Sequence, residues 1–201
     1  MLDFVTGTVV AVNEKSVVIQ VGGIGLTINT PNARSFAPES SATLHTYLHW
    51  NADNGPSLFG FATTFDRTVF LMIIDCSKIG PAIGLSVLSQ LSASQFLEIV
   101  TTGNQDALSK VNGIGAKKAE QIIVELKHKV QKLLQSGALK IEQQESFVQW
   151  LQLSEVLASL NYTKQEVTKA TAYLSEKYTG QNLALDQLIR ASLAYLSQKQ
   201  G

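Results

Sequence analysis

Short runs of alternating apolar and polar residues fill the first third of the chain and predict a small all-β domain. Turn residues, such as Gly22-Gly23, separate the runs from one another. Strands of this number and spacing favour a small closed barrel. The expected strands are Val5–Val12, Ser16–Val21, Ile24–Thr30, Ala42–His49 and Ser57–Ala62.

From Thr64 onward the apolar residues recur every three or four positions, which predicts helices instead of strands. Ser92 with Gln95 three positions later has the pattern of a capping box and predicts the start of a helix. A longer helix is expected from Ala119 through Val130 and Leu134. The middle of the chain is therefore expected to be a helical domain.

A polar stretch at 137–146 predicts a linker into a last domain. Beyond it, three helices are expected at about 147–160, 163–177 and 184–198, the second opened by a capping box of Thr163 and Glu166. A three-helix bundle this small, without a polar cluster, is more typical of a protein-binding module than of a catalytic domain.

The composition is that of a folded globular protein, because 45% of the residues are hydrophobic and 16% are charged. The longest apolar run, Val69–Ile74, is far shorter than the roughly 20 residues of a membrane-spanning helix. The first residues lack the pattern of a secretory signal, so we expect a cytoplasmic protein. The single cysteine, Cys76, is expected to be a small core residue and not a zinc ligand.

One segment of the helical region repeats itself. Ile79-Gly80-Pro81-Ala82 aligns with Ile114-Gly115-Ala116-Lys117 at an offset of 35 residues. Such self-similarity indicates one supersecondary unit used twice, here a helix, a short glycine-containing hairpin and a second helix. The small and apolar positions that follow also align: Gly84 with Ala119, Val87 with Ile122, Leu88 with Ile123 and Leu91 with Leu126.

A hairpin of this kind is suited to binding phosphate. Glycine lets a phosphate approach the main chain, and the first amides of the next helix are unpaired donors at the positive end of its dipole. Lys117 and Lys118 add charge in the first turn, where a cation disfavours the helix unless an anion is bound. The alternative interpretation is a pair of tight turns between packed helices. Contacts to phosphates carry no sequence information, so the DNA-binding hypothesis predicts selectivity for shape.

The distribution of charge fits this hypothesis better than the zero net charge does. Residues 1–63 contain 2 basic residues (Lys and Arg) and 4 acidic residues (Asp and Glu), residues 64–140 contain 9 basic and 6 acidic, and residues 141–201 contain 5 basic and 6 acidic. Only the middle segment is basic, and its excess is modest. Phosphate binding therefore has to use backbone donors as well as side chains.

Order and spacing of these motifs resemble the RuvA family, the junction-binding subunits of the bacterial Holliday junction branch migration complex, over essentially the whole chain. The resemblance implies an α+β multidomain protein. Its expected domains are an OB-like barrel at 1–63, a tandem helix-hairpin-helix domain at 64–136, a linker at 137–146 and a UBA-like three-helix bundle at 147–201. The matching pieces are Gly22-Gly23-Ile24-Gly25, Leu58-Phe59-Gly60-Phe61, Ile79-Gly80-Pro81, Asn112-Gly113-Ile114-Gly115, Lys117-Lys118-Ala119-Glu120, Ile123-Val124-Glu125-Leu126-Lys127 and Leu160-Asn161-Tyr162.

The resemblance also implies site residues. An acidic pin in the last hairpin of the barrel falls on Asp53 and Asn54, of which only Asp53 keeps a carboxylate. In the first helical hairpin the family pattern has Gly and Lys where this chain has Lys78 and Ala82, so the first site departs from the family at two positions. The expected phosphate-binding residues are Lys78, Ile79, Gly80, Pro81, Gly113, Ile114, Gly115, Ala116, Lys117 and Lys118.

The partners that the resemblance implies are a four-way DNA junction and RuvB, a hexameric ATPase that would supply ATP hydrolysis. A homotetramer or octamer would hold the junction open and square, and the RuvC resolvase is a further partner of the complex. The expected motor contacts in the last domain are Val156, Leu160, Tyr162 and Val167, an apolar set that fits a domain core equally well.

Catalytic residues are not expected. The chain lacks the phosphate-binding loop of ATPases, and Asp66, Asp75 and Asp106 are too scattered for the metal ions of a nuclease. We expect no cofactor and no metal. His45 and His49 are expected to face solvent or the barrel rim, and His128 has no partner at a recognisable motif spacing.

Trp50 and Trp150 are expected to be packing anchors, although Trp50, beside the pin hairpin, could stack on an unpaired base. Two other functions stay open. One is a generic DNA-binding helix-hairpin-helix protein without preference for junctions. The other is a scaffold that binds only proteins.

Overall fold

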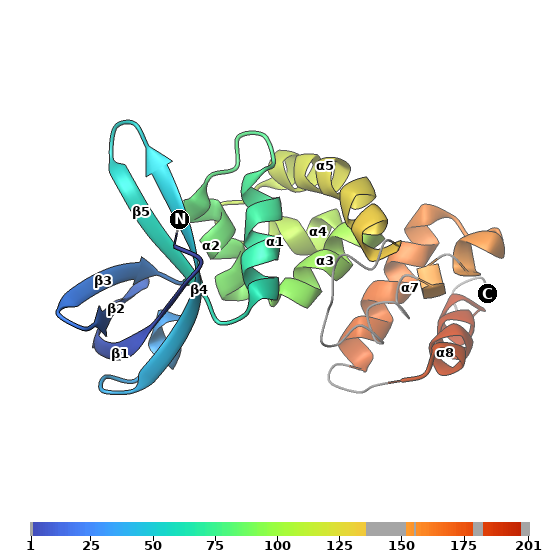
Figure 1. The fold of residues 1–201 in the computed structure, drawn as a ribbon. Helices are drawn as coiled ribbons and strands as arrows, with labels where there is room; N and C mark the ends of the chain where they lie inside the picture. The colour runs from blue at the N-terminus through green and yellow to red at the C-terminus, as the bar shows by residue number, and fades with distance from the viewer. Residues whose placement is uncertain (1, 136–151, 155, 179–182, 198–201) are drawn as a thin grey trace. The chain divides into compact units, whose positions relative to one another are not determined.

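The computed structural model describes residues 2–135, 152–154, 156–178 and 183–197 (Figure 1). The chain divides into two compact units, Met1–Ala93 and Ser94–Gly201. The expected linker at 137–146 and Trp150 lie outside the described residues.

The first unit contains a closed five-stranded barrel, which confirms the expected OB-like fold. Around the barrel the strand order is β1-β2-β3-β5-β4, and β4 pairs again with β1. All pairs are antiparallel except β3 with β5, which closes the barrel. The strands are β1 (Phe4–Val12), β2 (Ser16–Val21), β3 (Ile24–Asn29), β4 (Ser41–Asn51) and β5 (Gly55–Phe61).

Alternate residues of these strands fill the barrel, as the period of two predicts. Val9, Ile19 and Leu44 are completely buried there. Gly60 also faces the interior, where a Cβ would lie 2.5 Å from Ile28 Cγ2, so the packed wall requires glycine at this position. Between β3 and β4 the chain forms a short 3-10 helix, Ala33–Ser35.

Strands β4 and β5 form an arm that is longer than the sequence predicts. Their pairing continues to Asn51 opposite Gly55, which leaves only residues 52–54 for the turn. The reason is local: Oδ1 of Asn51 accepts hydrogen bonds from the backbone N–H groups of Asp53 and Asn54 at 2.9 and 3.0 Å and closes the turn. The sequence predicts a turn from Asn51 to Pro56, since Asn is common at the start of a tight turn, but it does not show that the Asn51 side chain lets the strands pair as far as Asn51.

Helices α1 (Thr64–Ile74) and α2 (Pro81–Gln90) belong to the same unit as the barrel. The Thr63 side chain caps α1 by accepting a hydrogen bond from the N–H of Asp66. One guanidinium nitrogen of Arg67 donates to the carboxylate of Asp3 at 2.6 Å and to main-chain oxygens of β4 and the N-terminal segment. These contacts tie α1 to the barrel.

An aromatic cluster fixes the arm against α1. The ring of Phe70 lies 4.7 Å from that of Phe61, 5.4 Å from Phe59 and 6.0 Å from Tyr47, measured between centroids. Phe61 and Phe70 are completely buried. The first helical hairpin and the arm are therefore held in one packed body.

The second unit contains the remaining helices. Helix α5 begins at Ala116, three residues before the predicted start, because the carbonyl of Gly115 already accepts the N–H of Ala119. Residues 152–154 and 156–159 are also helical, and the capping box of Thr163 and Glu166 is confirmed. The bounds are α3 (Ala93–Thr102), α4 (Gln105–Ser109), α5 (Ala116–Gln135), α7 (Lys164–Lys177) and α8 (Leu185–Ser197).

The C-terminal helices share a small core of their own. Leu153, Leu157, Ala170, Leu174, Leu188 and Leu196 are buried in it. Of the helices that the structure describes, none is by itself long and apolar enough to span a membrane, and α2 and α3 have that length and composition only when taken together.

Candidate nucleic-acid interface

The first helical hairpin joins α1 to α2. Ile79 is buried, and its N–H donates to the carbonyl of Cys76 at 3.1 Å. Gly80 is the N-cap of α2, and its carbonyl accepts the N–H of Gly84 at 3.1 Å. Cys76 is itself buried, as expected of a core residue. The buried isoleucine anchors the loop and leaves the exposed Gly80 at the start of the helix.

The second hairpin joins α4 to α5 in the other unit. Ile114 is buried, and its N–H donates to the carbonyl of Val111 at 2.9 Å. The carbonyl of Gly115 accepts the N–H of Ala119 at 3.0 Å. Lys117 is exposed in the first turn of α5, and Nζ of Lys118 donates to the carbonyl of Gly113 at 3.2 Å. One of the two lysines therefore also stabilises the hairpin itself.

The two hairpins have the same internal geometry at the offset of 35 residues. The hydrogen bond from Ile79 to Cys76 in the first hairpin corresponds to the one from Ile114 to Val111 in the second. The bond from Gly84 to Gly80 corresponds in the same way to the one from Ala119 to Gly115. The positive φ angles also coincide, because Lys78 has a φ of 62° where Gly113 has a φ of 90°. Gly84 and Ala119 are both buried, and a Cβ on Gly84 would lie 2.8 Å from the ring of Phe70. The sequence repeat is thus a structural repeat.

Both hairpins leave room for an anion beside the main chain. A Cβ added to Gly80 or to Gly115 would meet no atom within 4 Å, and neither residue has a positive φ. The first amides of a helix have no intrahelical partner, and those of α5 lie next to Gly115. In α2 the first residue, Pro81, has no N–H and the N–H of Ile83 donates to the carbonyl of Gly80 at 3.0 Å, so Ala82 is the residue of the first turn whose amide can serve an anion there. Neither side-chain packing nor the backbone conformation therefore requires glycine at these two positions. Close approach of a ligand to the main chain would explain why glycine is present.

Lys78→Gly is expected to raise the free energy of unfolding of the first unit by up to about 1 kcal/mol, because a lysine with positive φ is strained and a glycine is not. The same change removes an exposed charge beside Gly80, so the slope of log Kd for DNA against log salt should fall by about one. Thermal unfolding and a salt titration measure the two effects. Lys110→Gly is the control for stability: Lys110 has a φ of −76°, and its replacement should destabilise. A lower free energy of unfolding for Lys78→Gly than for the wild type would contradict the conclusion that the backbone of Lys78 is strained.

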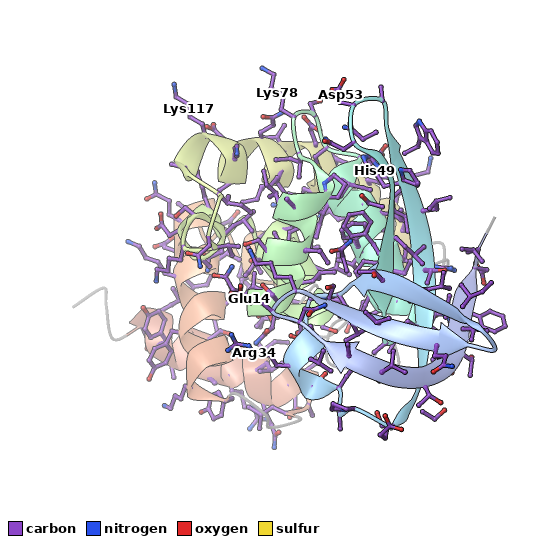
Figure 2. The ribbon with its side chains drawn as sticks, turned by 90° about the vertical axis from the view of Figure 1, so that its left-hand side faces the viewer. Glu14, Arg34, His49, Asp53, Lys78 and Lys117 are labelled. Atoms are coloured by element: carbon purple, nitrogen blue, oxygen red, sulfur yellow. The ribbon has the colours of Figure 1, made fainter. Side chains whose placement is uncertain are left out.

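The tip of the β4–β5 arm carries one free carboxylate. Asp53 is exposed, whereas the side-chain amide of Asn54 donates to Oδ1 of Asn51 at 3.3 Å. Asn54 is therefore used inside the turn. Figures 1 and 2 show that this tip and the loop holding Lys78 project from the same side of the first unit.

Three ring-bearing side chains of β4 are singled out in the sequence, and one of them differs from its expectation. Trp50 is not a packing anchor, because 71% of it is exposed. His45 and His49, expected to face solvent or the barrel rim, are half-buried. The ring of His49 packs edge-on against Phe59 at 6.3 Å, and Nδ1 of His45 is buried without a hydrogen-bond partner in the described part of the chain. His45 pairs with both β1 and β5, whereas Trp50 pairs with Pro56 near the end of the arm, and strand periodicity does not reveal this difference.

The expected motor contacts separate into two kinds. Tyr162 and Val167 pack against the core of the C-terminal helices, and Val156 is half-buried. Leu160 is half-exposed. Of this set, only Leu160 is an exposed apolar residue.

A second surface on these helices is aromatic and basic. The rings of Tyr173 and Tyr195 stack with centroids 4.3 Å apart, and Nζ of Lys177 lies 5.4 Å from the centroid of Tyr173. Tyr173, and to a smaller degree Tyr178, raises the pKa of Lys177 through hydrogen bonding and electrostatic attraction.

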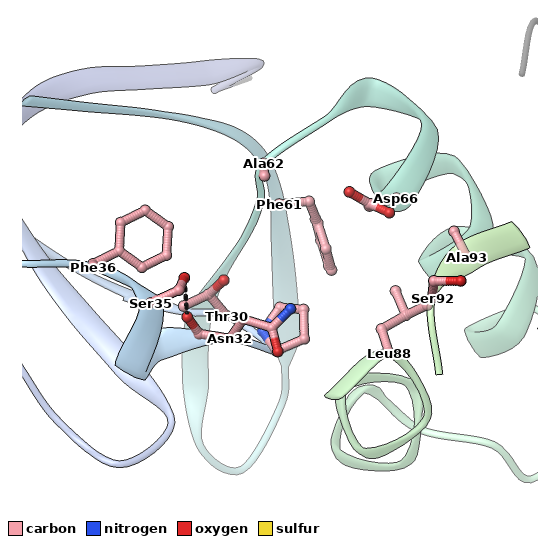
Figure 3. Close-up of a pocket in the computed structure, with 11 residues that line it drawn as sticks. Thr30, Asn32, Ser35, Phe36, Phe61, Ala62, Asp66, Leu88, Ser92 and Ala93 are labelled. Atoms are coloured by element: carbon pink, nitrogen blue, oxygen red, sulfur yellow. Dashed lines mark hydrogen bonds between the residues drawn. The ribbon is translucent and has the colours of Figure 1, made fainter. Parts of the chain in front are cut away.

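A pocket of about 180 Å³ lies in the first unit between the barrel and α1 and α2 (Figure 3). Small-molecule sites usually hold roughly 300 to 1,000 Å³, so this one is small. Its one ionisable lining residue, Asp66, already accepts a hydrogen bond from the hydroxyl of Thr63 at 2.7 Å. Among the residues that the structure describes, no group of three or more His, Cys, Asp or Glu is arranged to hold a metal ion.

Comparisons with known proteins agree with this geometry. The family model described as the RuvA N terminal domain matches residues 1–60, and the SAM-like helix-hairpin-helix tandem matches residues 70–129. Three relatives carry the name Holliday junction branch migration complex subunit RuvA. The protein of Bacillus velezensis is 30% identical over 98% of this chain and 99% of its own length, that of Dehalococcoides mccartyi 32% over 99% and 100%, and that of Tropheryma whipplei 31% over 100% of both.

Proposed function

Since the chain belongs to the RuvA family, we propose that it binds four-way DNA junctions and supports ATP-driven branch migration in recombination and repair. The observation that carries this proposal is the pair of hairpins with equivalent hydrogen bonds, each with a glycine open to solvent at the start of a helix. Such glycines let phosphates reach helix amides, and Lys117 adds charge beside one of them. Phosphate contacts of this kind are independent of base sequence.

The proposed phosphate-binding residues are those of the two hairpins, Lys78 to Pro81 and Gly113 to Lys118. The proposed acidic pin is Asp53 at the tip of the arm. Its carboxylate would repel phosphates at the crossover and help to part the strands. Asn54 is neutral and its side chain is hydrogen-bonded to Asn51. The repulsion between this pin and the phosphates is therefore expected to be weaker than that of a pin with two carboxylates.

The proposed role is not catalytic. A separate motor, RuvB, would hydrolyse ATP, and the last domain would bind it, with Leu160 as the contact that the structure exposes most within the expected set. We further propose a cytoplasmic homotetramer or octamer, to which the RuvC resolvase can also bind. We propose the functional division expected from the sequence: a barrel at 1–63, tandem hairpins at 64–136, a linker at 137–146 and a motor-binding domain at 147–201.

A competition experiment tests this function. Unlabelled linear duplex of equal length competes with a labelled four-way junction for the full-length protein over a series of salt concentrations. We expect strong preference for the junction and an affinity that falls with salt by a log-log slope of about 0.9 for each phosphate neutralised. Equal affinity for both DNAs would indicate a generic DNA-binding protein. Absence of binding at low salt would leave only a protein scaffold.

A further inference from the structure

Trp50 presents an aromatic ring on the arm that no part of the protein core requires. The residue is 71% exposed, and its Cα partner across the arm is Pro56, which is also exposed. Along β4, Ala42, Leu44 and Thr46 face the barrel interior and are buried. Residues two positions apart in a strand lie on the same face, so Leu48 and Trp50 continue the face that points into the barrel interior. They are exposed because the arm extends beyond the barrel.

The opposite face of the arm is occupied by the protein itself. Tyr47, His49 and Phe59 lie on it and pack among themselves, with Tyr47 and Phe59 also against Phe70 of α1. The arm therefore has a fixed side and an open side. The indole of Trp50 is on the open side, and the packed side holds its backbone in place.

We propose that Trp50 stacks on a nucleobase next to the crossover of the junction and so stabilises a base that has lost its neighbour in the helix. This inference rests on the proposed function, because it places the tip of the arm, with Asp53, at the crossover. Repulsion by Asp53 and stacking on Trp50 are then complementary: the carboxylate separates strands, and the indole receives a base.

The position of Trp50 relative to the tip fits this role. The pair Trp50–Pro56 is the second rung of the arm, next to Asn51–Gly55. With a rise of about 3.3 Å per residue, the indole lies roughly 7 Å from the turn. Bases on one strand are spaced by about 3.4 Å. A tip at the crossover therefore places the indole within about two base steps of it.

The chemistry of the open side favours a base over a phosphate. Residues 48–58, all of which the structure describes, include no Lys or Arg. Leu48, Trp50 and Pro56 instead offer an apolar surface with an aromatic face. Every base has a π-face, so stacking on an exposed aromatic ring is tolerant of sequence, as junction binding requires.

A second protein is a poorer occupant of the same surface. Stable protein interfaces bury about 800 Å² on each partner and involve roughly 20 to 30 residues a side. Three apolar side chains on a two-stranded arm are far fewer than that. Phe4, another exposed aromatic residue, does not extend the patch, because it pairs with His45 and so lies on the other face of the sheet.

The test uses the full-length protein and four-way junctions that carry 2-aminopurine either beside the crossover or in the middle of an arm. Trp150→Phe leaves Trp50 as the one tryptophan, since the chain has two. We expect junction binding to quench Trp50 fluorescence and to change 2-aminopurine fluorescence only at the crossover. Trp50→Leu should weaken junction binding about tenfold and leave duplex binding unchanged, while Trp50→Phe should stay within about threefold of the wild type.

Ile24→Ala is the matched control, because Ile24 is another exposed apolar residue of the same barrel, at 64% exposure. It should bind the junction as the wild type does. Equal junction affinity of Trp50→Leu and wild type, with junction preference intact, would overturn the stacking proposal alone. Absence of junction preference in the wild type would overturn the proposed function as well. Trp50 fluorescence that depends on protein concentration without DNA would assign the surface to self-association and also overturn the proposal.

Discussion

Lys117→Glu is expected to weaken binding of a four-way junction by about tenfold to a hundredfold at low salt while it makes α5 more stable. Lys117 is exposed in the first turn of α5, where the helix dipole disfavours a cation. A glutamate there should raise the free energy of unfolding by about 0.3 to 1 kcal/mol. It should also repel the phosphate that the lysine attracts. Gain of stability with loss of affinity is a combination that a purely structural lysine would not give.

Junction titrations across a salt series, together with thermal unfolding, measure both effects. The slope of log Kd against log salt should fall by about one. Lys132→Glu is the control, because it makes the same change of charge in the last turn of α5. It should bind nearly as the wild type does and lose a little stability. Lys118 is less suitable for this test, since its amine donates to the carbonyl of Gly113 and so also supports the hairpin. A Lys117→Glu protein with wild-type affinity would remove Lys117 from the phosphate-binding set.

Gly115→Val is expected to reduce junction affinity by about tenfold to a hundredfold, the loss that corresponds to charge-assisted hydrogen bonds of about 1.5 to 3 kcal/mol. A Cβ at Gly115 would meet no protein atom within 4 Å, so the fold accepts the side chain. The side chain would instead fill the space through which a phosphate reaches the first amides of α5. The stability cost should be at most about 1 kcal/mol, since valine is a poor residue before a helix.

Gly113→Val separates this effect from backbone strain. Gly113 has a φ of 90°, which valine rarely adopts, so this variant should lose stability by about 1 to 3 kcal/mol. Thermal unfolding and junction titration should therefore distinguish the two variants. Gly115→Val should lose junction affinity with little loss of stability, whereas Gly113→Val should lose both affinity and stability. Gly80→Val makes the same test in the first hairpin. Unchanged affinity of Gly115→Val would show that no phosphate approaches this glycine.

The element order and the repeat could be predicted from the sequence because both are local properties. Strand β2 has the predicted bounds, and the other strands differ by only one or two residues at their ends. The alignment of Gly80 with Gly115 was visible in the residues alone, and the structure shows the same hydrogen bonds in both copies. Periodicity and glycine placement act over a few residues, so the chain itself reports them.

The tertiary structure decided where that local pattern stops applying. Trp50 continues the alternation of β4, yet it is exposed because the arm leaves the barrel before this residue, and only the closure of β3 onto β5 fixes that point. The strain at Lys78 and the internal hydrogen bond of Asn54 likewise depend on how the loops fold. Sequence thus determined which residues alternate and which repeat. Burial, exposure and backbone strain depend on contacts between distant segments, and those exist only once the chain has folded.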